Sequence, residues 1–289
     1  VTSAATARTQ INQESLLTSH RLRSKWGHYL SGVIYYEGEW YWGIDRLHHL
    51  EDRLNALGLS KQTHLAREGQ RAPLFLTPQF QSLGPVPEGT SIDFFLSLRS
   101  PYSAISCAKL FPWAKANGVQ INLRYVLPMV MRGLPVPAEK RKYISLDAAR
   151  EAFVQGVPFG RLNDPVGKPT ERGLALIPFA QMHELAEDYV MSFMQGVWSE
   201  GLDAGTDAHL KIIVERCGLH WQAAKDILKS QSNEQHWRAA AEQNRQALFA
   251  LGLWGVPSFK FEDTAVWGQD RFWVIEKALH DRFDLPPSH

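Results

Sequence analysis

Residues 92–103 read IDFFLSLRSPYS, and the fold can be worked out from this stretch. Its apolar start predicts a buried strand at 92–96, and the apolar residues after Pro101 predict a helix over 101–116. Proline suits the first turn of a helix, because the N–H groups of that turn have no partner within the helix. Ser100 is therefore predicted at a helix start, where unpaired N–H groups and the helix dipole favour an anion such as a thiolate.

Ser100 also has a purely structural interpretation. Serine followed by proline is a common helix N-cap that needs no further function. On residues 100–103 alone, the cap is the favoured interpretation, so the rest of the chain has to decide between the two.

Composition narrows the class of protein. The chain has 289 residues, of which 44% are hydrophobic and 21% are charged, as is typical of a globular protein with a sizeable core. A net charge of +1 provides no electrostatic basis for binding nucleic acid or an anionic membrane. No apolar run approaches the ~20 residues of a membrane span, and the first residues lack the apolar core of a signal peptide.

The two cysteines, Cys107 and Cys217, lie far apart in the sequence. This separation excludes a Cys-x-x-Cys redox pair and most zinc sites, so we expect no metal. Sparse cysteine usage also fits a reducing compartment, and we expect a cytoplasmic location.

The chain divides into three predicted regions. Residues 1–67 hold a polar helix, a hairpin at about 33–42 and a short amphipathic helix, whereas residues 68–90 are rich in Pro, Gly and Gln and predict a linker. Residues 91–289 form the main domain, whose order is strand, helix, strand, a helical block at about 138–251, then strand, strand and helix. Helices within the block are predicted near 139–154, 170–185, 189–198, 207–217, 221–230 and 233–250.

This order predicts an α/β fold class with a small mixed sheet flanked by helices. The first strand–helix–strand unit implies a parallel pair with a crossover helix. The helical block interrupts the sheet and is predicted as a large inserted subdomain.

A second motif, GVPSF at 255–259, opens the strand after the helical block. In thioredoxin-like folds this order of elements places a cis-proline opposite the helix N-terminus. A cis Pro257 would leave the backbone N–H and C=O of Val256 available to pair with an extended peptide. The alternative is an ordinary trans proline at the start of a strand.

Three stretches together resemble a known family: FFLSLRSPYS at 94–103, GVPSF at 255–259 and WGQDR at 267–271. They look like the signatures of 2-hydroxychromene-2-carboxylate isomerases, which are related to kappa-class glutathione transferases within the DsbA-like part of the thioredoxin superfamily. The resemblance covers residues 91 to about 283. It implies a thioredoxin-like fold of the DsbA/kappa type and glutathione as cofactor or co-substrate.

The resemblance also implies site residues. The glutathione-binding set is Ser100, Tyr102, Val256, Pro257, Gln269 and Asp270. Ser100 is the candidate catalytic residue, because the matching serine hydrogen-bonds the glutathione sulfur. Val256 would pair with the cysteinyl backbone, and the Gln-Asp pair would meet the γ-glutamyl end. The alternative for Asp270 is a plain N-cap or an ion pair with a neighbouring arginine.

The chain departs from the family pattern at two places. Family members often carry an Asn after the second strand, whereas residues 129–137 read MVMRGLPVP. Arg99 stands where a small or apolar residue is usual. The basic stretch KRKY at 140–143 does match the family, and it would meet an acidic substrate or a glutathione carboxylate, or form a solvated helix face.

The N-terminal region repeats part of the main domain. WGIDRL at 42–47 parallels WGQDRF at 267–272, and GVIYY at 32–36 parallels GVPSF at 255–259. On this alignment Ile34 takes the position of the proline and Ile44 that of Gln269, so we predict a partial thioredoxin-like ββα segment without a glutathione site. It is either the remainder of a longer tandem protein or a remnant docked on the intact domain or a partner chain. Because half a sheet has unpaired edges, residues 30–57 should pack against another segment.

The leading hypothesis is a glutathione-dependent isomerase or transferase acting on an electrophilic aromatic or unsaturated acid. The alternatives are a non-catalytic thioredoxin-like scaffold that binds a peptide at Val256 and Pro257, or a DsbA-like oxidoreductase relative that has lost its cysteines. We expect a small-molecule substrate, no nucleic acid and no membrane as partners, with a homodimer as one expected assembly.

Overall fold

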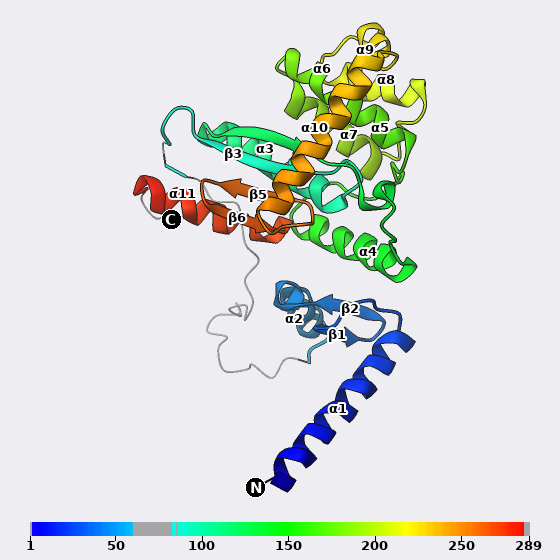
Figure 1. Ribbon diagram of the computed structural model, residues 1–289, viewed down its shortest axis with the longest axis vertical. Helices are drawn as coiled ribbons and strands as arrows, with labels where there is room; N and C mark the ends of the chain where they lie inside the picture. Colours follow the sequence, from blue (N-terminus) through cyan, green and yellow to red (C-terminus); the bar gives the residue numbers. More distant parts are fainter. Residues whose placement is uncertain (1, 60–82, 85, 286–289) are drawn as a thin grey trace. The chain divides into compact units, whose positions relative to one another are not determined.

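The computed structural model describes residues 2–59, 83, 84 and 86–285 (Figure 1). These residues group into two compact units. Unit 1 comprises Val1–Thr77 and Val136–Asp147, and unit 2 comprises Pro78–Pro135 and Ala148–His289. Most of the predicted linker at 68–90 lies outside the described residues.

Unit 2 is built on a four-stranded mixed sheet. Its strands are β3 (Ser91–Leu96), β4 (Gln120–Tyr125), β5 (Ser258–Phe261) and β6 (Thr264–Trp267), in the order β4-β3-β5-β6. Strands β3 and β4 run parallel and are joined by helix α3 (Pro101–Asn117), whereas β5 is antiparallel to both β3 and β6. The predicted mixed sheet and crossover helix are confirmed.

The strand directions bring three chain segments to one edge of this sheet. The parallel strands β3 and β4 both end there, and the Val126 N–H donates to the Leu96 carbonyl at 2.9 Å. Strand β5 begins at the same edge because it runs antiparallel to β3. We call this the site edge, made of residues 97–100, 126–132 and 254–257.

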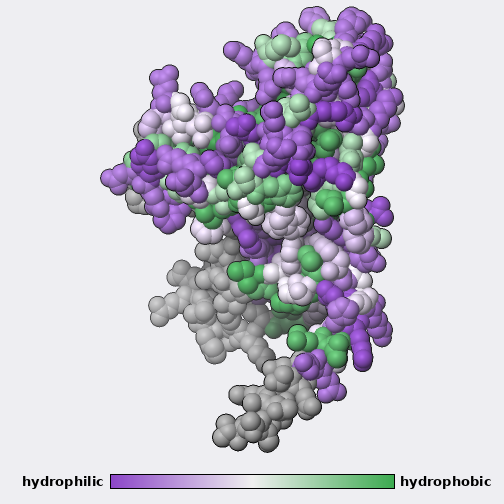
Figure 2. Space-filling model, viewed as in Figure 1, coloured by the Kyte–Doolittle hydropathy of each residue, from purple (hydrophilic) through white to green (hydrophobic). Residues whose placement is uncertain are grey.

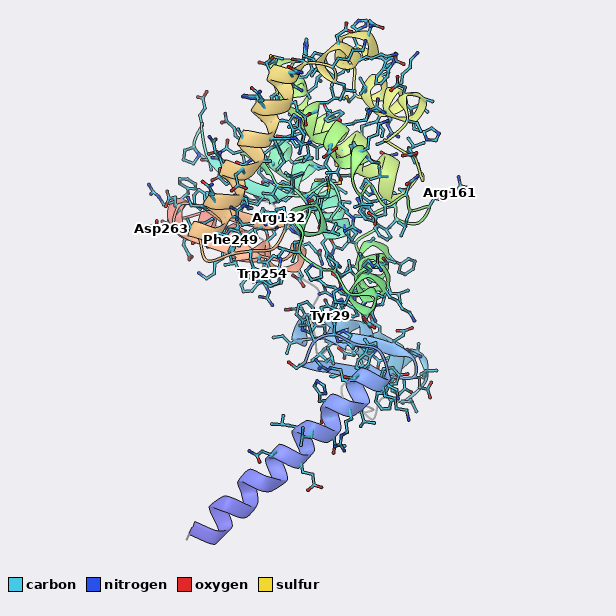
Figure 3. All side chains as sticks on the ribbon, turned by 45° about the vertical axis from the view of Figure 1, so that its right-hand side comes forward. Tyr29, Arg132, Arg161, Phe249, Trp254 and Asp263 are labelled. Atoms are coloured by element: carbon cyan, nitrogen blue, oxygen red, sulfur yellow. The ribbon has the colours of Figure 1, made fainter. Side chains whose placement is uncertain are left out.

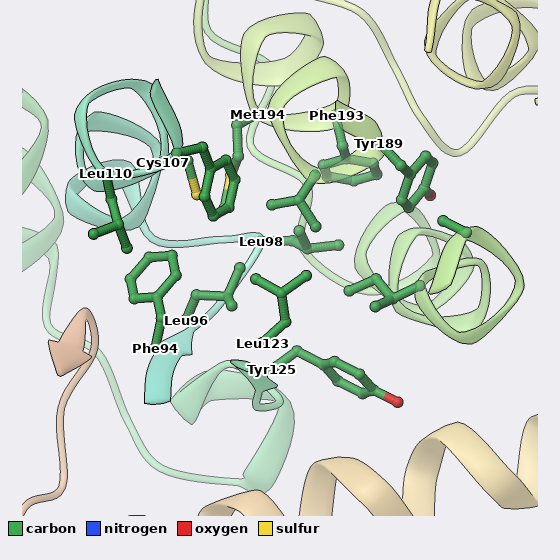
Figure 4. Packing of buried hydrophobic residues seen from close by; sticks show 14 of the residues in the cluster. Phe94, Leu96, Leu98, Cys107, Leu110, Leu123, Tyr125, Tyr189, Phe193 and Met194 are labelled. Carbon is green, nitrogen blue, oxygen red and sulfur yellow. The ribbon is translucent and has the colours of Figure 1, made fainter. Parts of the chain in front are cut away.

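The core of unit 2 lies against the face of β3 that carries Ile92, Phe94 and Leu96. Phe94 stacks on Phe259 of β5 with ring centroids 5.2 Å apart, and Leu96 and Leu98 continue the apolar line toward the helices (Figure 4). Cys107 of α3 is fully buried in this core, and burial raises the pKa of its thiol well above the ordinary value. Cys107 therefore packs as a small hydrophobic residue.

The helical block contains α4 (Ala138–Val154), α5 (Lys168–Ala175), α6 (Ile177–Met182), α7 (Ala186–Trp198), α8 (Asp207–Arg216), α9 (Trp221–Ile227) and α10 (Gln231–Ala250). The single helix predicted over 170–185 is wrong, because α5 and α6 are separate. Pro178 lies in the first turn of α6, and its missing N–H prevents one continuous helix. After β6 the chain forms a 3₁₀ turn, η3 (Gln269–Arg271), and then α11 (Trp273–Phe283).

Unit 1 contains α1 (Thr2–Lys25), β1 (Val33–Tyr36), β2 (Glu39–Trp42), η1 (Ile44–Arg46) and α2 (Leu47–Ala56), together with the first half of α4. The Nε of Arg46 donates to both carboxylate oxygens of Asp147, at 3.0 and 2.9 Å, and both side chains are buried. The Tyr143 hydroxyl donates to the same carboxylate at 3.2 Å. The η1 turn after the N-terminal hairpin therefore packs against the first half of α4.

The two hairpins share one register, and this corrects the sequence alignment. Val33 faces Trp42 as Ser258 faces Trp267, and the Gly43 N–H donates to Gly32 as the Gly268 N–H donates to Pro257, at 3.0 Å in both cases. Gly32, and not Ile34, thus holds the position of Pro257. The alignment was wrong by two residues because the matching Gly-Val pairs fall at different places in the two hairpins. Ile44 does hold the position of Gln269, and it is 76% exposed.

Candidate functional site

Ser100 closes the N-terminus of α3 and also reaches across to a distant segment. Its Oγ accepts from the Ser103 N–H at 3.1 Å, and its carbonyl accepts from the Ala104 N–H at 3.1 Å. The same hydroxyl donates to the Val256 carbonyl at 3.4 Å. Ser100 is therefore an N-cap, as its structural interpretation predicted, and it also contacts the segment that holds the second motif.

The peptide bond between Val256 and Pro257 is cis, so the structure decides between the two alternatives that the sequence left open. Pro257 is buried and Val256 is half-buried. Gly255 lies directly against the ring of Trp267, since a Cβ built there would be 2.4 Å from the Trp267 Nε1. Only glycine allows this approach, which packs the residues before β5 against the end of β6.

Gln269 is buried and both ends of its amide are engaged. Its Nε2 donates to Glu151, and its Oε1 accepts from the Gln155 Nε2 at 2.7 Å. Both partners lie in the second half of α4, so the structure uses Gln269 to hold η3 against that helix. A ligand would reach this buried amide through its second N–H or the second lone pair of its oxygen, or by displacing one of these bonds.

Asp270 is half-exposed beside Gln269. The N-cap of η3 is Gly268, so Asp270 lies inside the first turn and is not the cap residue. Gly268 has a φ of 118°, and a Cβ there would lie 2.5 Å from the Asp270 Oδ1. Glycine at 268 therefore lets the carboxylate fold back over the backbone.

Tyr102 occupies the α3 surface next to Ser100. It is half-buried and packs on a small apolar cluster of Ile105, Ala148 and Ala152, to which Phe159 also belongs. Phe159 in turn stacks on Trp198, with ring centroids 6.1 Å apart. Tyr102 therefore packs with Phe159 against residues of α4, close to the N-terminus of α3.

The structure explains the unusual Arg99. Its guanidinium binds the carboxylate of Asp164 with two hydrogen bonds, of 2.7 and 2.6 Å. Asp164 lies in the loop between α4 and α5, so the pair holds that loop to the turn before Ser100. Sequence reasoning missed Asp164, because no local pattern links two residues that lie 65 positions apart.

The basic stretch at 140–143 lies in the unit 1 half of α4. Lys140 is placed over the ring of Tyr29 at 5.8 Å, and burial lowers the pKa of its amine. Arg141 and Lys142 are exposed, and Tyr143 is buried against the ring of His28.

Residues 91–280 match the family model of the DSBA-like thioredoxin domain. The chain belongs to this family. The matched region spans the sheet, the helical block and the residues around Ser100 and Val256. In the described part of the chain, no helix is long and apolar enough to cross a membrane.

Two similar proteins are named as isomerases. The chain is 26% identical over 199 residues to a 2-hydroxychromene-2-carboxylate isomerase of Sphingobium xenophagum. The matched stretch covers 66% of this chain and 98% of that protein. It is 22% identical over 196 residues to the enzyme of the same name from Pseudomonas putida, with coverage of 65% and 93%. The resemblance read from the three motifs is thereby confirmed.

Solved structures show the same DsbA-like fold. A structure of 2-hydroxychromene-2-carboxylate isomerase matches with a TM-score of 0.57 and 21% identity, over 67% of this chain and 96% of that one. The cytosolic disulfide reductase DsbM from Pseudomonas aeruginosa matches with a TM-score of 0.52 and 15% identity, over 67% and 97%. The relatives are thus named as isomerases and as oxidoreductases, and this chain carries serine at both 100 and 103.

Proposed function

We propose that this protein is a glutathione-dependent isomerase or transferase that acts on an electrophilic aromatic or unsaturated acid. The observation that carries the proposal is the 3.4 Å hydrogen bond from the Ser100 hydroxyl to the Val256 carbonyl. It joins a hydroxyl at a helix start to a backbone carbonyl 156 residues away, next to Pro257. The isomerase names of the relatives and a structure of DsbM with GSH support the proposal.

The residues around Ser100 fit the chemical groups of glutathione. A thiolate needs a donor and a positive environment, which the Ser100 hydroxyl and the N-terminus of α3 supply. A peptide N–H needs an acceptor, and the Val256 carbonyl has only the long bond from Ser100 among the described residues. An ammonium needs a carboxylate, and the half-exposed Asp270 is the candidate.

Bound glutathione would supply a thiolate that adds reversibly to a carbon–carbon double bond and so permits rotation about it. Ser100 would turn its hydroxyl from Val256 to the sulfur and hold it charged, while Ser103 keeps the Ser100 oxygen in place. Val256 would orient the tripeptide along the start of β5. Gln269 would act indirectly, by fixing η3 and hence Asp270 against α4.

Calorimetric titration with glutathione tests the proposal. We expect wild-type protein to bind with a Kd between micromolar and low millimolar, and Ser100→Ala and Asp270→Ala to weaken binding about ten-fold or more, since each removes a bond to a charged group. Asp263→Ala is the matched control, because Asp263 is an exposed carboxylate in the β5–β6 turn (Figure 3). Absence of glutathione binding by the wild-type protein would contradict the proposal.

One observation favours the scaffold alternative. The Gln269 amide is buried and already hydrogen-bonded to Glu151 and Gln155, so it is less accessible to glutathione than the sequence predicted. A non-catalytic protein that binds an extended peptide at Val256 needs no contact to Gln269. Peptide binding without glutathione binding, in the same calorimetric experiment, would favour this alternative.

A further inference from the structure

Arg132 lies in the 129–137 stretch, where this chain lacks the Asn that family members often carry, and its guanidinium is incompletely paired. It ends the 3₁₀ turn η2 (Met129–Arg132), which follows β4 at the site edge. Its Nε is buried and makes no hydrogen bond to any residue that the structure describes. A buried donor without a partner costs free energy, and an anion bound there would recover it.

The charges near Arg132 favour an anion. Arg245 of α10 lies close enough to lower the pKa of Arg132, although burial is the larger cause. The nearby carboxylate of Glu242 is engaged by Arg245, whose Nε donates to it at 2.7 Å, and by the Gln246 amide at 3.1 Å. These bonds hold the pKa of Glu242 at about 2. Arg132 and Arg245 therefore have one nearby carboxylate between them, that of Glu242, and this carboxylate is hydrogen-bonded to Arg245.

The surroundings of Arg132 are apolar and aromatic. Phe249 and Trp254 are 44% and 49% exposed, and Val130 and Leu134 flank Arg132 in the chain with exposed side chains of their own. In the view of Figure 3, Arg132, Phe249 and Trp254 all project near the lower end of α10, where Arg245 lies over the Phe249 ring at 5.0 Å. On the face shown in Figure 2, hydrophobic residues gather around the same end of this helix. A cation among exposed aromatic rings suits an aromatic carboxylate better than a small inorganic anion.

Arg132 and Ser100 come from the same edge of the sheet. Arg132 follows β4, Ser100 follows the parallel strand β3, and Trp254 lies just before Val256, which the Ser100 hydroxyl contacts. Helix α10 is tied to this edge as well, because the Asn244 Nδ2 donates to the Tyr125 carbonyl at 3.0 Å. An acid held by Arg132 would therefore lie at the edge that carries Ser100.

We infer that Arg132 binds the carboxylate of the acid substrate, with Phe249 and Trp254 packed against its apolar part. The inference rests on the proposed function for the substrate class, and it adds the group that recognises the acid. Arg132 is then a specificity-determining residue, since it selects substrates that carry a carboxylate.

Calorimetry with trans-cinnamate and its neutral analogue cinnamamide tests the inference without glutathione. We expect wild-type protein to bind cinnamate about ten-fold or more tightly than cinnamamide, as one charge-assisted contact allows. Arg132→Gln should lose this preference and keep its affinity for cinnamamide and for glutathione, whereas Arg132→Lys should retain part of it. Arg161→Gln is the matched control, because Arg161 is exposed on another loop (Figure 3). Unchanged melting temperatures would show that all variants are folded.

The outcomes separate this inference from the proposed function. Equal binding of cinnamate and cinnamamide by wild-type protein, no binding of cinnamate, or an unchanged preference in Arg132→Gln would overturn the inference. Weaker glutathione binding in Arg132→Gln with unchanged cinnamate binding would assign Arg132 to a glutathione carboxylate and overturn it as well. Cinnamate binding that depends on Arg132 in a protein that does not bind glutathione would support the inference and contradict the proposed function.

Discussion

The Ser100 hydroxyl takes part in two hydrogen bonds, and a thiol would compete for only one of them. The bond that it accepts from Ser103 holds the start of α3, whereas the longer bond that it donates to Val256 is available for exchange. The same hydroxyl caps α3 and has a proton to donate to a ligand. Ser100 can therefore be a helix N-cap and a thiolate-binding residue at once. The two interpretations of SPYS are therefore not exclusive.

Cys107 is placed where its own thiol is not expected to react. The thiol is fully buried and burial raises its pKa, so the reactive thiolate is scarce at neutral pH. We predict that a chromogenic disulfide reagent modifies Cys107 in the native protein at least about a hundred-fold more slowly than in urea. The Cys107→Ser variant identifies the signal, and fast modification of native Cys107 would contradict the prediction.

At the scale of elements, the start of β5 depends on a close approach between Gly255 and the Trp267 ring. A Cβ at 255 would lie 2.4 Å from the Trp267 Nε1, so the ring or the backbone would have to move. We predict that Gly255→Ala lowers the free energy of unfolding by about 1–3 kcal/mol and weakens glutathione binding, because Val256 moves with its neighbour.

Urea denaturation followed by circular dichroism measures this loss of stability. Gly160→Ala is the matched control, since nothing lies within 4 Å of a Cβ at that position. Equal stability of Gly255→Ala and wild-type protein would show that the packing of Trp267 on Gly255 is not needed.

The elements themselves were largely predictable, because their signals are local. The apolar run at 92–96 and proline at 101 mark a strand and a helix start, and both are found where expected. The prediction of one helix over 170–185 was wrong because Pro178, a local signal for a helix start, lies in the middle of that range. The hairpin alignment failed because residue identity was used where the register of paired strands decides.

At the scale of the whole molecule, unit 1 is held together by the pair of Arg46 and Asp147. Both side chains are buried, and removal of the Asp147 carboxylate takes away both acceptors of the Arg46 Nε and the opposite charge beside it. We predict that Asp147→Ala costs about 3–5 kcal/mol in the stability of unit 1. Hydrogen exchange should show lost protection over residues 33–56, with β3 and β5 still protected.

Asp52→Ala is the control for this experiment, because Asp52 is exposed on α2. Full protection of β1 and β2 in Asp147→Ala would mean that the ion pair does not stabilise unit 1. Loss of protection in β3 and β5 as well would mean that the two units unfold together.

The sequence by itself determined the order of the elements, the helix start at Ser100, the proline strand at Pro257 and the repeat of the Trp-Gly-x-Asp-Arg motif. Each of these depends on the backbone preferences and burial of neighbouring residues, so a short stretch of chain carries the information. The tertiary structure alone decided that Gln269 meets Glu151, that Arg99 meets Asp164 and that Asn244 of α10 meets Tyr125 at the end of β4. Those contacts join segments 65 or more residues apart, and only the packed chain selects which charged and polar groups come together.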